Sequence, residues 1–181
     1  MTTQPETQDH QIVNGLDITA VKEALATVAA APGASRAPKT SRVRWLGGFK
    51  IKALVRNHEF VVDEPATFTA EDTAPNAMEY VLGALGACFI TGFVLNASKQ
   101  GIAIRNLEVT LDADQNNVFT FFGLSDEGHP GFEHIKAKLY VQADADEATL
   151  QAVWDYTIQT SPVVNSLTRV VTIQPEIAVF P

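Results

Sequence analysis

The chain has 181 residues, of which 46% are hydrophobic, with a formal net charge of −8 and a pI of about 4.9. Its length and composition support one globular domain with a sizeable core, and its acidity argues against nucleic acid as a partner, because phosphate binding needs clustered Lys and Arg. No apolar run is expected to reach membrane-spanning length, because charged or polar residues interrupt every candidate, and we expect no membrane partner. The polar N-terminus lacks the order of a signal peptide, and there is one cysteine, so the sequence favours a cytoplasmic protein.

Residues 1–39 predict a unit appended to a main domain that spans residues 40–181. A mobile tail is expected to residue 15, and a helix follows that Asp17 or Thr19 caps and Pro32 ends. Its apolar side chains repeat at helical spacing, so we expect it to pack on a neighbouring surface or on a second subunit.

Residues 42–68 alternate as strands do, and "RNH" at 56–58 predicts a hairpin turn between two of them. Basic residues alternate with apolar ones here, which indicates the solvent face of two strands rather than a nucleic-acid site. These basic residues are Arg42, Arg44, Lys50, Lys52 and Arg56.

Residues 75–100 predict one long helix with a capping box formed by Asn76 and Glu79, and with Gly101 as its C-terminal stop. The helix is apolar on every side, which predicts burial between a sheet and another helix, of this chain or of a partner subunit. Small residues at 83–87 would allow that close approach.

The remaining residues predict strands at 102–114 and 132–144, with a part-strand, part-loop connection between them. A second helix is expected from residues 144–146 to about 159, where Ser161-Pro162 ends it. "VVTIQPEIAVF" at 170–180 predicts a closing strand. The fold class is therefore α+β, with antiparallel strands.

The chemistry-bearing residues are few. The four histidines are scattered, so we expect no metal site, and no motif for a nucleotide or other cofactor is present. Cys88 is the remaining candidate nucleophile, about three turns into its helix and beyond the reach of the helix dipole. Two interpretations stay open, a reactive thiol and a buried structural cysteine.

The order of "VDEP", "TAPNAMEYVLGALGAC" and "TSPVVNSLT" resembles the OsmC/Ohr family of osmotically inducible and organic hydroperoxide resistance proteins, over roughly residues 42–181. The resemblance implies an OsmC-like fold, in which antiparallel sheets wrap the long central helices of an intertwined homodimer. It also implies a peroxidase site: one cysteine reduces the hydroperoxide, a second resolves it as a disulfide, and an arginine and a glutamate stabilise the thiolate.

Transferred to this chain, that site is incomplete. The first cysteine matches Cys88, and the resolving position is Ser161. The glutamate position is Met78, with Glu79 beside it but on the opposite side of the helix from Cys88. The arginine position is Phe49, which leaves Lys50 or Arg56 as distant substitutes. The chain therefore resembles the one-cysteine "SPV" branch with YhfA-type proteins.

Two functions follow from this resemblance. The first is a stress-response thiol-dependent reductase of organic hydroperoxides that uses Cys88, with Ser161, Glu79 and Arg56 as further candidate site residues. The alternative is a non-catalytic dimer that binds an apolar small molecule between the central helices and the sheet. A structural or interaction role of the helix at residues 17–31 is a third possibility.

Overall fold

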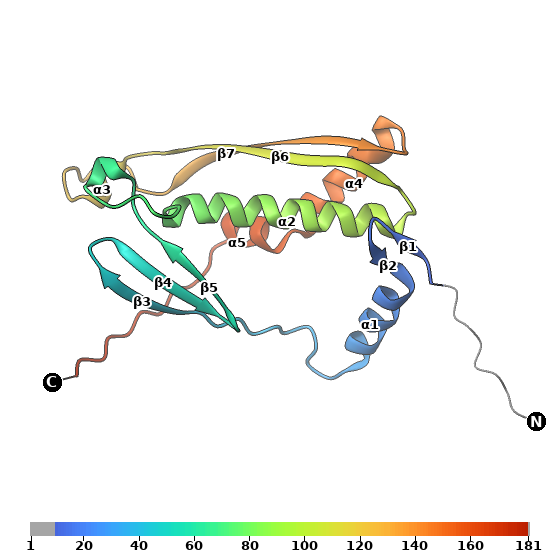
Figure 1. The fold of residues 1–181 in the computed structure, drawn as a ribbon, viewed down its shortest axis with the longest axis horizontal. Coiled ribbons are helices and arrows are strands. Elements are labelled where there is room, and N and C mark those ends of the chain that lie inside the picture. Colours follow the sequence, from blue (N-terminus) through green and yellow to red (C-terminus); the bar gives the residue numbers. More distant parts are fainter. Residues whose placement is uncertain (1–9, 181) are drawn as a thin grey trace, which may run out of the picture.

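The computed structural model describes residues 10–180. Its elements form small antiparallel sheets and helices, which confirms the predicted α+β class (Figure 1). In chain order they are β1 (Ile12–Val13), β2 (Leu16–Asp17), α1 (Ile18–Ala30), β3 (Arg42–Gly47), β4 (Lys50–Val55), β5 (His58–Val62), a 3-10 turn (Ala66–Phe68), α2 (Ala77–Lys99), β6 (Ile104–Gln115), α3 (Val118–Phe121), β7 (Phe132–Ala143), α4 (Glu147–Thr160) and α5 (Pro162–Thr168).

The long helix α2 is the central element of the structure, and the other elements lie around it. The predicted capping box is confirmed: Glu79 N donates to Asn76 Oδ1 over 2.9 Å, and Asn76 N donates to Glu79 Oε2 over 2.7 Å. β6 and β7 pair along their whole length and cover one side of α2, while α4 packs beside it (Figure 1). The buried core lies between them and comprises Phe93, Ala97, Ile102 and Val153.

The opposite side of α2 is open within one chain, so the expected burial of that side would need a partner subunit. Its exposed positions are Gly83, Ala84, Ala87 and Thr91. α2 is also long and apolar enough to cross a membrane, with a mean hydropathy of 1.8 over its most apolar window. The expectation that no stretch reaches spanning length is therefore wrong, although core helices of soluble proteins pass the same test.

Residues 42–62 form three antiparallel strands where two were expected. The additional turn lies at Gly47 and Gly48, whose φ angles of 121° and 54° are readily adopted only by glycine. β3 therefore ends there, and β4 returns along it before the predicted turn at 56–58 leads into β5.

The N-terminal segment contains a hairpin where a tail to residue 15 was expected. β1 and β2 are joined by Asn14 and Gly15, with φ angles of 51° and 76°, as in the Asn-Gly turns that suit tight hairpins. The tail prediction is wrong for residues 12–15, and residues 1–9 lie outside the described part. Asp17 caps α1 by accepting from Ala20 N, which confirms the predicted start of that helix.

Two predictions for the later part of the chain are wrong. The connection between β6 and β7 carries the short helix α3 rather than more strand. Residues 170–180 form no strand, and their apolar side chains are exposed. α4 begins at Asp146 and ends before Ser161 as predicted, but α5, which starts at Pro162, was not foreseen.

Candidate functional site

Cys88 and Ser161 lie side by side. Cys88 Sγ is 3.2 Å from Ser161 Oγ, in hydrogen-bonding range for a sulfur atom. Cys88 belongs to the middle of α2, and Ser161 joins α4 to α5, so residues 73 positions apart meet where three helices converge. Cys88 is half-buried and Ser161 is 4% exposed, which shields the pair from bulk water.

Ser161 is fixed in place by its role as a helix cap. Its Oγ accepts from Val164 N over 3.2 Å and so caps α5, and Pro162 occupies the first position of that helix. A hydroxyl that accepts at one lone pair still has its own proton to donate. When Cys88 loses its proton, only Ser161 can be the donor in this pair, so the hydroxyl can stabilise a thiolate or a sulfenate.

A second polar pair lies further along the same helix contact. Asn96 Nδ2 donates to Thr157 Oγ1 over 3.1 Å, and Thr157 Oγ1 donates to Val153 O over 2.8 Å. Gly92 lies between the two pairs, where an added Cβ would be 2.9 Å from Thr157 Cγ2. The missing side chain at Gly92 lets α4 approach α2 closely enough for Ser161 to reach Cys88.

Cys88 and Ser161 line a surface hollow of about 520 Å³ together with Asn96 and Thr157. Lys99, at the last turn of α2, is the one charged side chain among the described residues that line it. The thiol therefore has a path to small molecules, and the polar groups nearest to it are neutral.

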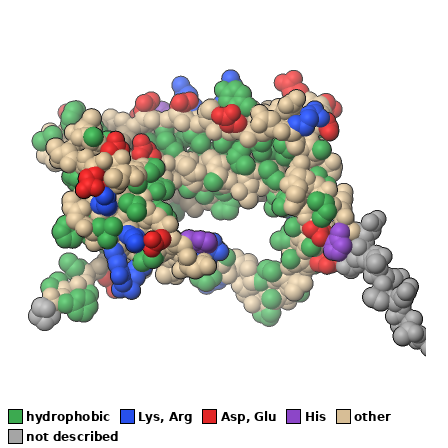
Figure 2. Space-filling view, viewed as in Figure 1, with side chains coloured by type: hydrophobic (Ala, Val, Ile, Leu, Met, Phe, Trp, Pro, Cys, Tyr) green, Lys and Arg blue, Asp and Glu red, His purple; other side chains and the backbone are tan. Residues whose placement is uncertain are grey.

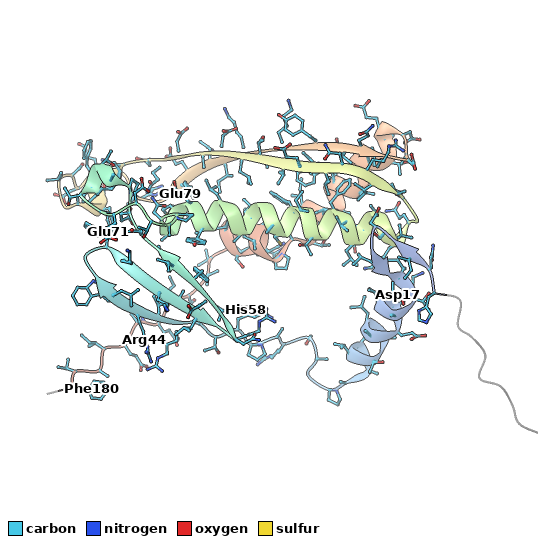
Figure 3. The ribbon with its side chains drawn as sticks, viewed as in Figure 1. Asp17, Arg44, His58, Glu71, Glu79 and Phe180 are labelled. Carbon is cyan, nitrogen blue, oxygen red and sulfur yellow. The ribbon has the colours of Figure 1, made fainter. Side chains whose placement is uncertain are left out.

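The other predicted site residues lie elsewhere. Glu79 stands at the start of α2, where the capping box occupies it (Figure 3). Arg56 lies in the turn between β4 and β5, with a φ of 57°. Lys50 pairs with Glu71, which raises the pKa of its ammonium group. None of the three lines the hollow at Cys88.

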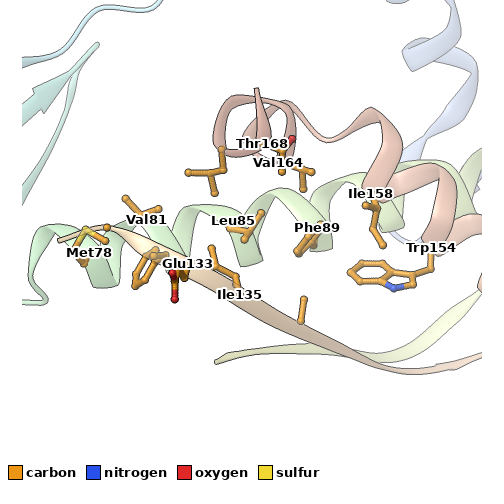
Figure 4. Close-up of a pocket in the computed structure, with 14 residues that line it drawn as sticks. Met78, Val81, Leu85, Phe89, Glu133, Ile135, Trp154, Ile158, Val164 and Thr168 are labelled. Atoms are coloured by element: carbon orange, nitrogen blue, oxygen red, sulfur yellow. Dashed lines mark hydrogen bonds between the residues drawn. The ribbon is translucent and has the colours of Figure 1, made fainter. Parts of the chain in front are cut away.

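A separate apolar cavity of about 630 Å³ lies between α2, β7, α4 and α5 (Figure 4). Its walls include Leu85 and Phe89 from α2, Ile135 from β7 and Trp154 from α4. The ring centroids of Phe89 and Trp154 are 4.8 Å apart. Glu133 is its one charged lining residue among those described. The cavity and the hollow at Cys88 share no lining residue, although Phe89 is the sequence neighbour of the thiol.

Carboxylates near the start of α2 are perturbed by their surroundings. Asp63 is buried and accepts from Thr73 N, Thr73 Oγ1 and Glu64 N, and the two hydrogen bonds from Thr73 above all hold the pKa of Asp63 below its usual value. Burial, and then the charge of Glu79, raise the pKa of Glu64. Among residues 10–180, no group of three or more His, Cys, Asp or Glu side chains could hold a metal ion.

Sequence reasoning alone missed the Asn96–Thr157 pair. The available signal for the pair was spacing: Asn96 lies eight residues after Cys88 and Thr157 four before Ser161, so each shares a helix face with a member of the first pair. A ligand between the central helices and the sheet was one of the expected functions, but the residues that line the cavity could not be named from the sequence, because apolar residues are equally typical of a filled core.

The family model for OsmC-like proteins matches residues 70–176. An OsmC-like protein from Mycoplasma pneumoniae has a similar structure, with a TM-score of 0.62 and 17% identity, over 72% of this chain and 87% of the other. An OsmC-like protein of unknown function from Vibrio cholerae gives a TM-score of 0.61 at 10% identity, over 74% and 95% of the two chains.

An organic hydroperoxide resistance protein OsmC from Legionella pneumophila gives a TM-score of 0.54 at 15% identity, over 73% of this chain and 90% of the other. A comparison with curated proteins found no match. At these identities the structural likeness shows the fold, and the family match covers more than half of the chain. The chain belongs to the family of OsmC-like proteins.

Proposed function

We propose that this protein is a stress-response thiol reductase that reduces organic hydroperoxides with Cys88 as its only redox cysteine. The observation that carries the proposal is the 3.2 Å contact between Cys88 Sγ and Ser161 Oγ. A thiolate needs a donor or a cation to stabilise it, and Ser161 is a neutral donor held in place by its capping bond. The name of the Legionella pneumophila neighbour supports the choice of substrate class.

The proposed reaction cycle has three steps. The Cys88 thiolate attacks the terminal oxygen of the hydroperoxide, the O–O bond breaks, and the alkoxide takes up a proton to leave as an alcohol. Cys88 is thereby oxidised by two electrons to a sulfenic acid. An external thiol then displaces water to give a mixed disulfide, and a second external thiol releases Cys88 as a thiol together with an external disulfide.

An external reductant is required because Ser161 cannot form a disulfide. Small thiols at sufficient concentration are found in a reducing cytoplasm, which is the location that we propose. The hollow of about 520 Å³ at Cys88 gives such a thiol access to the sulfur. Glu79 and Arg56 stay candidate site residues, although neither lines that hollow within one chain.

Thiol titration tests the proposal. One molar equivalent of cumene hydroperoxide should remove the single titratable thiol per chain, and a small dithiol should restore it. The Cys88→Ser variant should leave the peroxide concentration unchanged. A wild-type thiol count that stays constant with peroxide remaining in solution would contradict the proposal.

We also propose a homodimer. The exposed small residues of α2, at positions 83, 84, 87 and 91, form a surface on which a second α2 can lie closely. Residues 170–180 add exposed apolar side chains with no partner among the described residues, such as Ile173 at 82% exposure and Ile177 at 89%. Light scattering should give twice the 19.6 kDa of one chain.

The apolar cavity favours a second candidate function, binding of an apolar small molecule between α2, β7, α4 and α5. Trp154 lines the cavity and the only other tryptophan, Trp45, is exposed, so a Trp45→Phe variant reports on the cavity by fluorescence. A fatty acid that binds should shift the Trp154 emission equally well in the Cys88→Ser background. An unchanged spectrum at saturating fatty acid would exclude this function.

A further inference from the structure

The N-terminal helix α1 is fixed to the C-terminal end of α2 by a single side chain. Asn14 Nδ2 donates to Ser98 Oγ and to Ile102 O, each over 2.9 Å, and Asn14 Oδ1 accepts from Ile104 N over 2.8 Å. Ile18, the first residue of α1, is 1% exposed. The hairpin β1–β2 therefore holds α1 at a defined place, although α1 lies outside the family match.

Beyond Val21, which is half-buried, the apolar side chains of α1 lack cover. Leu25 and Val28 are 50% and 53% exposed, and Ile18 is the only buried residue of the helix. The helix has 13 residues, a length at which an isolated helix is marginal in water. Its stability therefore calls for a surface that the described part of the same chain does not supply.

The sheet β3–β5 has an apolar face that is also partly uncovered. Val43, Ala53 and Phe60 are neighbours across the three strands and lie on this face. Phe60 packs against Tyr80 of α2 with ring centroids 4.9 Å apart, so the apolar face is turned toward α2. Val43 is nevertheless 60% exposed, while Arg44 on the other face points away from α2 (Figure 3).

α1 and the sheet project from the same side of α2, at its opposite ends (Figure 1). The space-filling view shows an opening between them (Figure 2). Within one chain, therefore, the apolar side of α1 and the apolar face of β3–β5 do not meet.

We infer that α1 of one copy packs with Leu25 and Val28 against the apolar face of β3–β5 of a second copy, around Val43. This inference rests on the homodimer proposed above. A two-fold axis perpendicular to α2 makes the two α2 helices antiparallel, so the end of one copy that carries α1 meets the end of the other that carries the sheet. Each copy then covers the two surfaces that the other leaves open.

Charge favours this arrangement over a parallel one. Parallel α2 helices would bring the two β3–β5 sheets to the same end of the dimer, each with Arg42 and Arg44 on β3, and like charges repel; Lys52 does not add to this repulsion because it is paired with Glu59. The antiparallel pairing instead places each sheet beside α1, whose charged residues are one Lys22 and one Glu23. The interface class is isologous, in which the same patches serve both copies.

Disulfide trapping in the full-length Cys88→Ser background tests the contact. Oxidation of the Leu25→Cys/Val43→Cys variant should convert most of the chain into a covalent dimer. Glu23→Cys/Val43→Cys is the matched control, because residue 23 lies about 200° around the helix from residue 25 and so on the opposite side of α1. The control should stay largely monomeric under denaturing conditions.

Two outcomes of the crosslinking and light-scattering experiments would contradict the inference. A light-scattering dimer in which residues 25 and 43 do not crosslink overturns the packing of α1 and leaves the homodimer intact. A monomer by light scattering overturns both. If the cysteine variants do not fold, hydrogen exchange of the unmodified protein gives the same answer: on dilution to monomer, amides of α1 and β3 should lose protection together, and unchanged protection overturns the inference.

Discussion

At the scale of single residues, the site depends on the Ser161 hydroxyl, which makes two contacts. Ser161 Oγ caps α5 through Val164 N and contacts Cys88 Sγ. The resemblance read from the sequence identified this serine only as the place of a missing cysteine. The structure adds that the replacement keeps a polar contact with the thiol while it removes the means to form an internal disulfide.

Replacement of Ser161 by alanine should slow alkylation of Cys88 at neutral pH about fivefold, because the attacking sulfur loses a hydrogen bond worth about 1 kcal/mol. The loss of the α5 cap should also lower the free energy of unfolding by about 1 kcal/mol. Asp146→Ala is the control, since it removes the cap of α4, where Asp146 Oδ1 accepts from Thr149 N, and touches no sulfur. Equal alkylation rates in all three proteins would refute the donor role.

The variant Ser161→Cys should regain a resolving thiol. With the two side chains already in contact, one equivalent of hydroperoxide should consume both thiols and leave an intramolecular disulfide. Mass spectrometry of the digested protein without reduction should find the peptides of residues 88 and 161 joined. Their recovery as separate peptides, with the peroxide consumed, would show that the two sulfur atoms cannot meet.

Asp63 should make the free energy of unfolding depend on pH in the acidic range. Its pKa in the folded protein is lowered by the hydrogen bonds from Thr73, so its contribution is present above its ordinary value of 3.8 and is lost as the pH falls through the lower folded value. Glu64, whose pKa is raised by burial, contributes in the opposite sense.

Urea unfolding at about pH 6 and about pH 3 measures this effect. The wild-type protein should lose more stability between the two than Asp63→Asn, in which Glu64 is retained as an internal reference. Equal losses in the two proteins would show that Asp63 ionises alike in the folded and unfolded states.

At the scale of elements, the close approach of α2 and α4 should depend on Gly92. The added Cβ of Gly92→Ala would meet Thr157 Cγ2, and Thr157 cannot turn away because its hydroxyl is bonded to Val153 O and to Asn96. We expect a loss of about 1–3 kcal/mol in the free energy of unfolding and a slower reaction of Cys88 with peroxide. Removal of that methyl in Gly92→Ala/Thr157→Ser should restore much of both, and no rescue would place the clash elsewhere.

The attachment of α1 should depend on Asn14. Asn14→Gly keeps the left-handed turn, with its φ of 51°, but loses the bonds to Ser98, Ile102 and Ile104. Hydrogen exchange in α1 should accelerate at least tenfold while exchange in the middle of α2 stays unchanged. Unchanged protection of α1 would mean that Ile18 alone holds the helix.

Much of this element scale could be predicted from sequence, because caps and apolar spacing are local signals. Asp17, Asn76 and Asp146 marked three helix starts, and the sequences around Val109 and Leu139 marked two strands. The turn at Gly47–Gly48 and the Asn14–Gly15 hairpin also have local signals, namely their glycines. The first interrupts a segment predicted as one strand, and the second interrupts a segment predicted as a tail.

At the scale of the whole molecule, the sequence is less informative, because contacts between residues far apart in the chain produce no regular spacing in the sequence. Nothing local says that Ser161 meets Cys88 or that Gly92 admits Thr157. The expected strand at 170–180 is absent, and within a single chain α2 is covered on one side only. Their open apolar surfaces agree with the proposed homodimer, in which a second copy would cover them.

The mass of the intact protein after reaction with one equivalent of cumene hydroperoxide tests the central claim most directly. With no resolving cysteine, the wild-type chain should gain one oxygen atom, located at Cys88, and a small thiol should return it to its starting mass. Cys88→Ser should gain nothing. An unmodified wild-type mass with the hydroperoxide still present would contradict the account and leave Cys88 a structural residue.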